Sequence, residues 1–267
     1  MPLTDVRGLS IYFEIHGKGP RVVWLSGTGG DLRQNPLRGR GPLEQHHEVL
    51  MYDQRGLGQT SKPDVPYFME DYADDAVALM DAFGWDCAHF VGVSFGGMVA
   101  QHVALRHPDR VDRLVLCCTS SGGAGGSSFD LLSVADLPVA ERLRTVLPLH
   151  DVRNEPDANP PRYAPMYDKL VPRISGPPLN ADDPAAAMGA HRQLEARARH
   201  DVWGRLAEIT APTYVVGGLF DRQAPPENLE NLAAAVPDAR MRLFDGGHMF
   251  LLQDPAAWTA ILEFLNS

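Results

Sequence analysis

The chain has 267 residues, of which 44% are hydrophobic and 22% charged, a composition typical of a globular protein. Its 24 lysines and arginines and 34 acidic residues give a net charge of −10, which disfavours binding to nucleic acids and anionic membranes. Three cysteines provide no disulfide framework, no signal peptide is visible, and no apolar run approaches the ~18 residues of a membrane span. We therefore expect a cytoplasmic protein that binds neither nucleic acid nor membrane. The sequence does not indicate its oligomeric state.

Short apolar runs bounded by glycine alternate with helical patterns over the first part of the chain. The predicted strands cover residues 9–15, 21–25, 49–52, 90–93 and 114–118, and the predicted helices cover residues 71–83 and 95–107. The alternation returns later, with predicted strands at residues 213–216 and 240–244 and helices at residues 226–235 and 254–265. This order is typical of βαβ units, so we expect an α/β fold with a mostly parallel sheet flanked by helices.

The alternation stops at Ser121, and a glycine-rich segment at residues 122–126 has the composition of a flexible connector. The chain up to residue 204 then shows short helix signals and no strong strand. Because so long a structureless loop is improbable in a compact domain, we predict a helical cap at residues 121–204 inserted into a core of residues 1–120 and 205–267. Its candidate pocket-lining residues, which could equally pack within the cap, are Phe129, Met166, Tyr167, Met188 and Trp203.

The strongest chemical signal is the sequence Gly-Val-Ser-Phe-Gly at residues 92–96, which fits the pattern G-x-S-x-G. It follows a predicted buried strand and precedes a predicted helix, which is where a nucleophile elbow exposes its serine. We therefore predict that Ser94 is a nucleophile.

A serine needs a base, and the base needs an acid that fixes its tautomer. His248 follows the last predicted strand and Asp221 follows the strand at residues 213–216, so both lie at the carboxyl edge where Ser94 is expected. Asp53 and Asp245 are rival acids, although Asp53 is better placed to hold its own turn. Four other histidines are expected in solvated turns or loops: His16, His46, His47 and His150. His102 and His107 belong to the helix after Ser94 and are expected to point elsewhere, and His191 and His200 lie in the expected insertion.

Acyl transfer also needs hydrogen-bond donors for the oxyanion. One is expected to be the backbone N–H of Phe95, and the other that of Thr28 in the glycine-rich loop at residues 26–30. That loop does not fit a dinucleotide-binding pattern, because Leu32 stands where a third glycine would be needed. The sequence also has no typical metal-binding spacing, so we expect neither a cofactor nor a metal.

These motifs together resemble the serine hydrolases of the α/β-hydrolase fold. The turn at residues 53–58 with Ser61 resembles the D-x-R-G-x-G-x-S turn of that family, residues 218–225 resemble its acid turn, and residues 247–255 resemble its histidine region. Many members have His-Gly in the first loop, where this chain has Ser26-Gly27. Within the family, the chain is most similar to small esterases and lactonases such as the 3-oxoadipate enol-lactonases.

We therefore predict a serine hydrolase that cleaves a small-molecule carboxylic ester or lactone. Ser94 would form an acyl-enzyme, His248 would carry the proton and Asp221 would orient His248. A first alternative is a C–C bond hydrolase or lyase with the same triad. A second is a ligand-binding protein on this fold, since fold does not imply function.

Overall fold

The structure is a computed structural model that describes residues 2–35, 41–155, 168, 179 and 182–267. The strands are β1 (Leu3–Val6), β2 (Leu9–His16), β3 (Arg21–Leu25), β4 (Glu48–Tyr52), β5 (Ala88–Val93), β6 (Val111–Cys117), β7 (Thr213–Gly218) and β8 (Ala239–Phe244). The described α-helices are α1 (Met69–Ala82), α2 (Phe95–Arg106), α3 (Val139–His150), α5 (Ala186–Ala198), α6 (Pro226–Ala235), α7 (Phe250–Gln253) and α8 (Ala256–Leu265). In this described part, no helix is long and apolar enough to span a bilayer.

The eight strands form one sheet in the order β1-β2-β4-β3-β5-β6-β7-β8. The pairs β1–β2 and β2–β4 are antiparallel, and every other pair is parallel. The fold is therefore the mostly parallel α/β sheet that the sequence predicts. The short edge strand β1 was not predicted.

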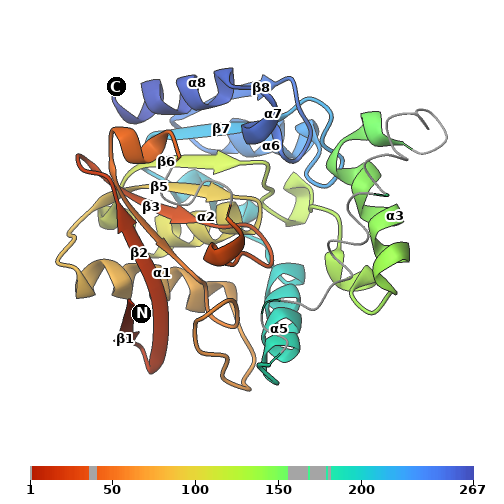
Figure 1. Cartoon of the computed structure of the whole chain (residues 1–267). Coiled ribbons are helices and arrows are strands. Elements are labelled where there is room, and N and C mark those ends of the chain that lie inside the picture. The colour runs from red at the N-terminus through yellow and green to blue at the C-terminus, as the bar shows by residue number, and fades with distance from the viewer. Residues whose placement is uncertain (1, 36–40, 156–167, 169–178, 180–181) are drawn as a thin grey trace.

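Helices cover both faces of the sheet (Figure 1). Along β3, Val23 and Leu25 belong to the same apolar cluster as residues of α1, α2 and α6, whereas Val22 and Trp24 pack in a second cluster with α8. Successive side chains of a strand point to opposite faces, so a run that is apolar at every position is buried on both. This is why the continuous apolar runs correctly predicted the central strands.

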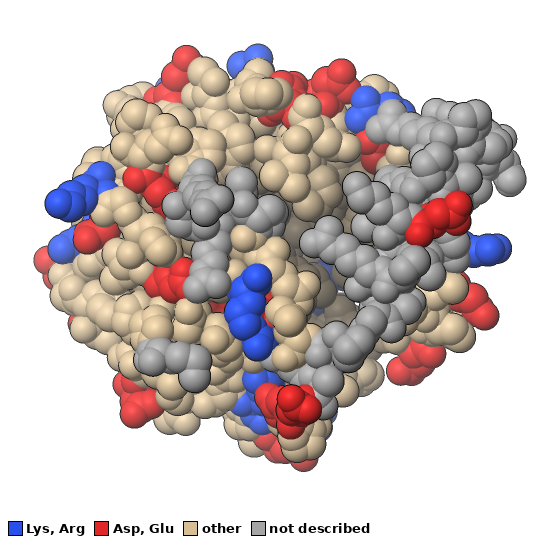
Figure 2. All heavy atoms as spheres, in the orientation of Figure 1, with Lys and Arg blue, Asp and Glu red and all other residues tan. Residues whose placement is uncertain are grey.

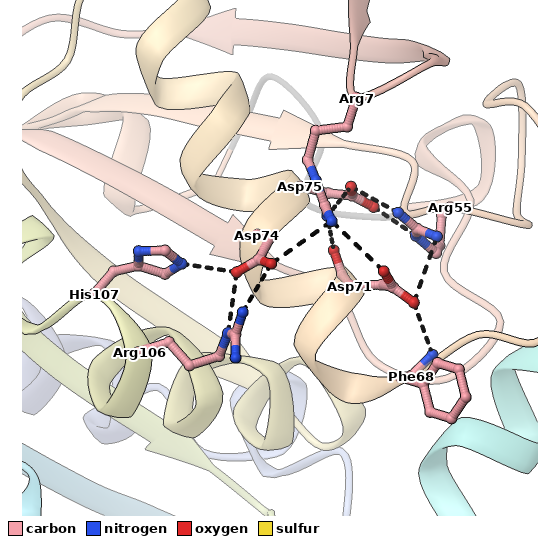
Figure 3. A network of polar contacts seen from close by, with 8 residues as sticks. All are labelled: Arg7, Arg55, Phe68, Asp71, Asp74, Asp75, Arg106 and His107. Carbon is pink, nitrogen blue, oxygen red and sulfur yellow. Dashed lines mark hydrogen bonds and ion pairs between the residues drawn. The ribbon is translucent and has the colours of Figure 1, made fainter.

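An ion-pair network fastens α1 to the neighbouring elements (Figure 3). Arg55 binds Asp75 through two hydrogen bonds of 2.7 and 2.8 Å, and Arg7 binds the same carboxylate at 2.8 Å. Arg7 also lies 3.6 Å from Asp74, which forms a second two-bond pair with Arg106 of α2. The network thereby fixes the turn after β4, which borders the candidate site.

The glycine-rich segment after β6 is not the flexible connector that its composition predicts. It forms a short 3-10 helix, η4 (Gly123–Gly125), that packs against residues 200–203. A Cβ at Gly122 would collide with the carbonyl oxygen of His200, and one at Gly125 with the ring of Trp203. Glycine is needed here for close approach rather than for freedom of motion.

Candidate active site

Ser94 lies in a sharp turn between β5 and α2. Its backbone φ is 54° and its ψ is −114°, a conformation that costs a non-glycine residue about 1–3 kcal/mol. The flanking glycines permit this turn, because a Cβ at Gly92 would collide with the backbone of Gly96, and one at Gly96 with the carbonyl of Leu25. The turn presents the Ser94 hydroxyl at the carboxyl edge of the sheet, which faces α3 and α5 (Figure 1).

The structure brings together the three residues predicted to form a triad. The Nε2 atom of His248 lies 3.0 Å from Ser94 Oγ, and its Nδ1 atom lies 2.7 Å from Asp221 Oδ2. The other oxygen of Asp221 accepts hydrogen bonds from the backbone N–H groups of Gln223 (2.8 Å) and Ala224 (3.0 Å). The carboxylate is therefore held on Nδ1–H, which leaves the lone pair of Nε2 facing the hydroxyl.

Neither rival acid lies beside His248 in this arrangement. Asp53 accepts the backbone N–H groups of Gln59 (2.8 Å), in its own turn, and of Leu32 (2.7 Å), in the earlier loop after β3. The Asp245 side chain is 73% exposed and pairs with Arg153. Asp221 is the carboxylate that the fold places on the imidazole.

Two backbone N–H groups near Ser94 are candidates for the oxyanion site. Phe95 is the first residue of α2, so its N–H has no acceptor within that helix. The loop that carries Thr28 passes against the nucleophile, because a Cβ at Gly27 would lie 3.5 Å from the Ser94 Cβ. Phe95 thus adjoins Ser94 and Thr28 follows the glycine that lies against it, and the role of both residues as oxyanion donors stays a prediction.

Two glutamines hold the first loop in position. Gln54 donates a hydrogen bond to the carbonyl of Ser26 (2.7 Å), and the backbone N–H of Gly29 donates to the side chain of Gln193 on α5 (2.9 Å). The segment between these two contacts contains Thr28. A helix of the insertion and the turn after β4 therefore meet at this loop, a contact that the sequence did not indicate.

The prediction that His150 is solvated is wrong. His150 ends α3, and its ring stacks on that of His248 with the centroids 5.4 Å apart. Its carbonyl accepts the backbone N–H of His248, and the carbonyl of Leu149 accepts that of Gln223 (2.9 Å). Burial, the largest effect, lowers the pKa of His150 to about 4, so the ring is uncharged at neutral pH.

The prediction of a solvated side chain is also wrong for His47, which is completely buried. His102 and His200 form a further buried pair, with a ring nitrogen of each 3.2 Å apart, and His200 also hydrogen-bonds the carbonyl of Ser120 (3.0 Å). This pair joins α2 to the segment that follows α5, although the two histidines lie 98 residues apart in the chain. Periodicity carries no signal for such a contact.

One group of potential metal ligands occurs among the described residues: Cys118, Asp221 and His248, whose ligand atoms lie within 4.8 Å of one another. The hydrogen bond between Asp221 and His248 already uses Nδ1. Burial raises the pKa of the Cys118 thiol far above its ordinary value, and only a thiolate binds metal well. The donor chemistry of this group fits a triad better than a metal centre.

The predicted pocket-lining residues divide into three groups. Met166 and Tyr167 lie outside the described residues. Trp203 packs against Gly125 and the apolar core, so it supports the fold of this region. Phe129 and Met188 are half-buried, and the backbone N–H of Phe129 donates to the carbonyl of Gln223 (2.8 Å).

The surface seen in Figure 2 is hollowed.

Comparison with known proteins agrees with this fold. Residues 20–255 match the sequence model of the alpha/beta hydrolase fold family, and the chain belongs to that family. Its members act as hydrolases on small molecules, which is the class of enzyme that the fold and the site define here.

The individual relatives have different activities. A putative carbamate hydrolase RutD from Pseudomonas savastanoi pv. phaseolicola is 31% identical over 94% of this chain and 96% of its own length. Among solved structures, the enol-lactonase from Burkholderia xenovorans LB400 is similar over the full length of both chains, with a TM-score of 0.78 and 27% identity. Est816, an enzyme that degrades N-acyl homoserine lactones, has a TM-score of 0.72 and 27% identity over 98% of this chain and 99% of its own.

Proposed function

We propose that this hydrolase cleaves a carboxylic ester or lactone through an acyl-enzyme on Ser94. The observation that supports this most strongly is the hydrogen-bonded chain from Ser94 Oγ through His248 to Asp221. A serine hydroxyl beside an imidazole whose other nitrogen is held by a carboxylate is the arrangement that activates serine for attack on a carbonyl.

In the first half of the reaction, Ser94 Oγ attacks the carbonyl carbon and its proton passes to His248 Nε2. The backbone N–H groups of Phe95 and Thr28 stabilise the oxyanion. His248 then gives the proton to the leaving oxygen, and the acyl group stays on Ser94. In the second half, water attacks this ester, and His248 carries the proton from water to Ser94 Oγ. Asp221 stabilises the imidazolium in both halves.

The insertion acts as a cap that selects the substrate in this proposal. The carboxyl end of α3 contacts the turns that carry Asp221 and His248, since the carbonyl of Leu149 accepts the N–H of Gln223 and the carbonyl of His150 accepts that of His248. The helix α5 contacts the loop of Thr28 through Gln193. A segment in contact with the Asp221 turn, the His248 turn and the Thr28 loop is well placed to exclude water and shape the acyl pocket.

Carbamate hydrolysis is a second candidate, because several curated relatives are putative carbamate hydrolases. A carbamate presents the same kind of carbonyl carbon to Ser94 with nitrogen in place of the leaving oxygen. His248 would protonate that nitrogen, so the same side chains serve both reactions.

The test begins with a serine-reactive phosphonate probe on wild-type protein and on Ser94→Ala. We expect stoichiometric labelling of the wild type and none of Ser94→Ala, together with a loss of ester hydrolysis of about 10⁴–10⁶-fold in the variant. A wild-type protein that does not label would support the ligand-binding alternative. If Ser94→Ala keeps a hundredth of the activity or more, the nucleophile is another residue.

A panel of substrates then separates the reaction classes. It contains simple esters, lactones of several ring sizes, carbamates with matched acyl groups, and β-diketones as substrates for C–C cleavage. The proposal predicts the highest kcat/KM on an ester or lactone. A carbamate or β-diketone preferred by tenfold or more would replace it.

A further inference from the structure

Two hydrogen-bond donors compete for one lone pair at the candidate active site. Gln223 places its side-chain nitrogen 2.8 Å from His248 Nε2, while Ser94 Oγ lies 3.0 Å from the same atom. Because Asp221 holds the proton on Nδ1, the neutral imidazole has a single lone pair at Nε2. Gln223 therefore occupies a position within hydrogen-bond distance of the proton-carrying nitrogen, beside the nucleophile.

The rest of Gln223 is fixed at this place. Its backbone N–H donates to Asp221 Oδ1 (2.8 Å), and its carbonyl accepts the N–H of Phe129 (2.8 Å). The residue is only 3% exposed, and its side-chain oxygen Oε1 is buried with no hydrogen-bond partner among the described residues. The Gln223 side chain approaches the neighbouring His150 ring closely enough to raise the pKa of His150 against the larger effect of burial, although no contact of Oε1 meets hydrogen-bond geometry. A buried acceptor without a donor costs about 1–3 kcal/mol, so its retention calls for an explanation.

The position of the Gln223 amide is also the position that the second half of the reaction requires. Once Ser94 is acylated, its oxygen no longer donates to His248. The attacking water must then lie within hydrogen-bond distance of Nε2, on the side that faces the acyl carbon. If the amide turns about its last side-chain bond while the backbone stays anchored, Oε1 replaces the nitrogen beside Nε2 and can accept a hydrogen bond from such a water.

We propose that Gln223 is a positioning residue for the water that hydrolyses the acyl-enzyme; this inference depends on the function proposed above. The water donates one hydrogen to His248 Nε2 and the other to Gln223 Oε1, which leaves an oxygen lone pair directed at the acyl carbon. The new C–O bond forms as the first hydrogen passes to Nε2. The tetrahedral intermediate then releases Ser94 Oγ, which takes that proton, and the free acid departs.

The first test separates the two halves of the reaction in Gln223→Met, which keeps the length of the side chain without its polar atoms. Stopped-flow measurement with p-nitrophenyl acetate gives the acylation rate from the burst and the deacylation rate from the steady state. We expect deacylation to fall about 10–100-fold, because a displaced reactant typically costs up to that factor. The burst amplitude and kcat/KM, which reports acylation, should stay within about threefold of the wild type. An equal loss in both halves would overturn the proposal.

Methanol provides a second test that a purely structural role would not affect. Methanol has a single O–H hydrogen, which it gives to His248, so it needs no second acceptor and does not depend on Oε1. In Gln223→Met, the ratio of methyl ester to free acid formed from the acyl-enzyme should therefore rise about tenfold. An unchanged ratio would contradict the role of Oε1. If Gln223→Met does not fold, Gln223→Asn, which withdraws the amide by one methylene, should show the same change.

A matched control is Gln253→Met on α7. Gln253 accepts the N–H of Gly247 (2.8 Å) and donates to Asp151 (3.2 Å), so it supports the histidine loop without facing Nε2. This variant should lower the free energy of unfolding and leave the methanol ratio unchanged. The two proposals fail separately. A wild type that the phosphonate probe does not label would refute the acyl-enzyme, whereas normal labelling with unchanged deacylation in Gln223→Met would refute the inference alone.

Discussion

At the scale of single residues, the contact between Asp221 and His248 Nδ1 determines which nitrogen faces Ser94. The carboxylate accepts two backbone N–H groups on its other oxygen, so it has little freedom to rotate. An amide in its place would disturb the choice of tautomer, because it can present N–H to the ring instead of accepting from it.

We predict that Asp221→Asn lowers kcat by about 10⁴-fold near neutral pH with little change in fold. The measurement is steady-state hydrolysis of the best ester, with circular dichroism to check folding. Asp245→Asn is the control, since its exposed side chain should change kcat by less than twofold. A large loss in the control, with a small one in Asp221→Asn, would show that the acid is misassigned.

At the scale of secondary-structure elements, buried polar contacts join helices that are distant in sequence. Asp75 of α1 is 1% exposed and neutralises Arg55, whereas Asp81 on the same helix is 62% exposed and pairs with Arg110. Removing one partner of a buried ion pair leaves the other charge unpaired and away from water, whereas an exposed ion pair contributes little to stability.

Asp75→Ala should therefore lower the free energy of unfolding by about 3–5 kcal/mol, and Asp81→Ala by less than about 1 kcal/mol. Urea unfolding at neutral pH measures both. Equal effects of the two substitutions would mean that the network of Figure 3 is no more than a surface feature.

The pair of His102 and His200 predicts a pH dependence of stability. Burial, the main cause, lowers the pKa of His102 to about 4 and that of His200 to about 3 in the folded protein, against about 6.5 in the unfolded chain. Between pH 6.5 and 4 the unfolded chain therefore binds more protons, so stability falls as the pH falls. Above pH 6.5 this pair adds no pH dependence.

Replacing both histidines by leucine should reduce the slope of unfolding free energy against pH between 6 and 4 by roughly 1–3 kcal/mol per pH unit. The measurement is a series of urea titrations at several pH values. His191→Ala serves as a control, because the His191 side chain is 48% exposed and its loss should leave the slope unchanged. If the double leucine variant keeps the wild-type slope of unfolding free energy against pH, as His191→Ala is expected to do, the prediction is wrong.

At the scale of the whole molecule, the end of α3 meets the histidine turn beside the candidate triad. The backbone of Gly247 lies so close to α3 that a Cβ there would collide with the carbonyl of His150. That carbonyl also accepts the N–H of His248, so movement of α3 would move the base.

Gly247→Ala should consequently lower kcat/KM by at least tenfold on small and large substrates alike, since the shift affects His248 rather than the acyl pocket. Gly204→Ala is the control, because a Cβ at Gly204 has no neighbour within 4 Å. Both variants are assayed on esters graded by acyl size. A loss confined to large acyl groups would place the effect in the pocket and not at the base.

The sequence by itself determined the order of strands and helices in the core and the candidate triad. Apolar runs report burial on both faces of a strand, and G-x-S-x-G reports a turn that only glycine flanks allow around Ser94. Asp221 and His248 could be chosen because parallel strands end at one edge, so residues that follow different strands meet there. These are local signals combined with one rule of topology.

Only the tertiary structure decided which further side chains contact that edge. Gln223 follows Asp221 by two positions, yet its contact with His248 depends on how two separate turns pack. His150 and Gln193 reach the site from helices whose docking no periodicity specifies. Because these contacts join segments far apart in the chain, they depend on the packing of the insertion against the core and not on local pattern.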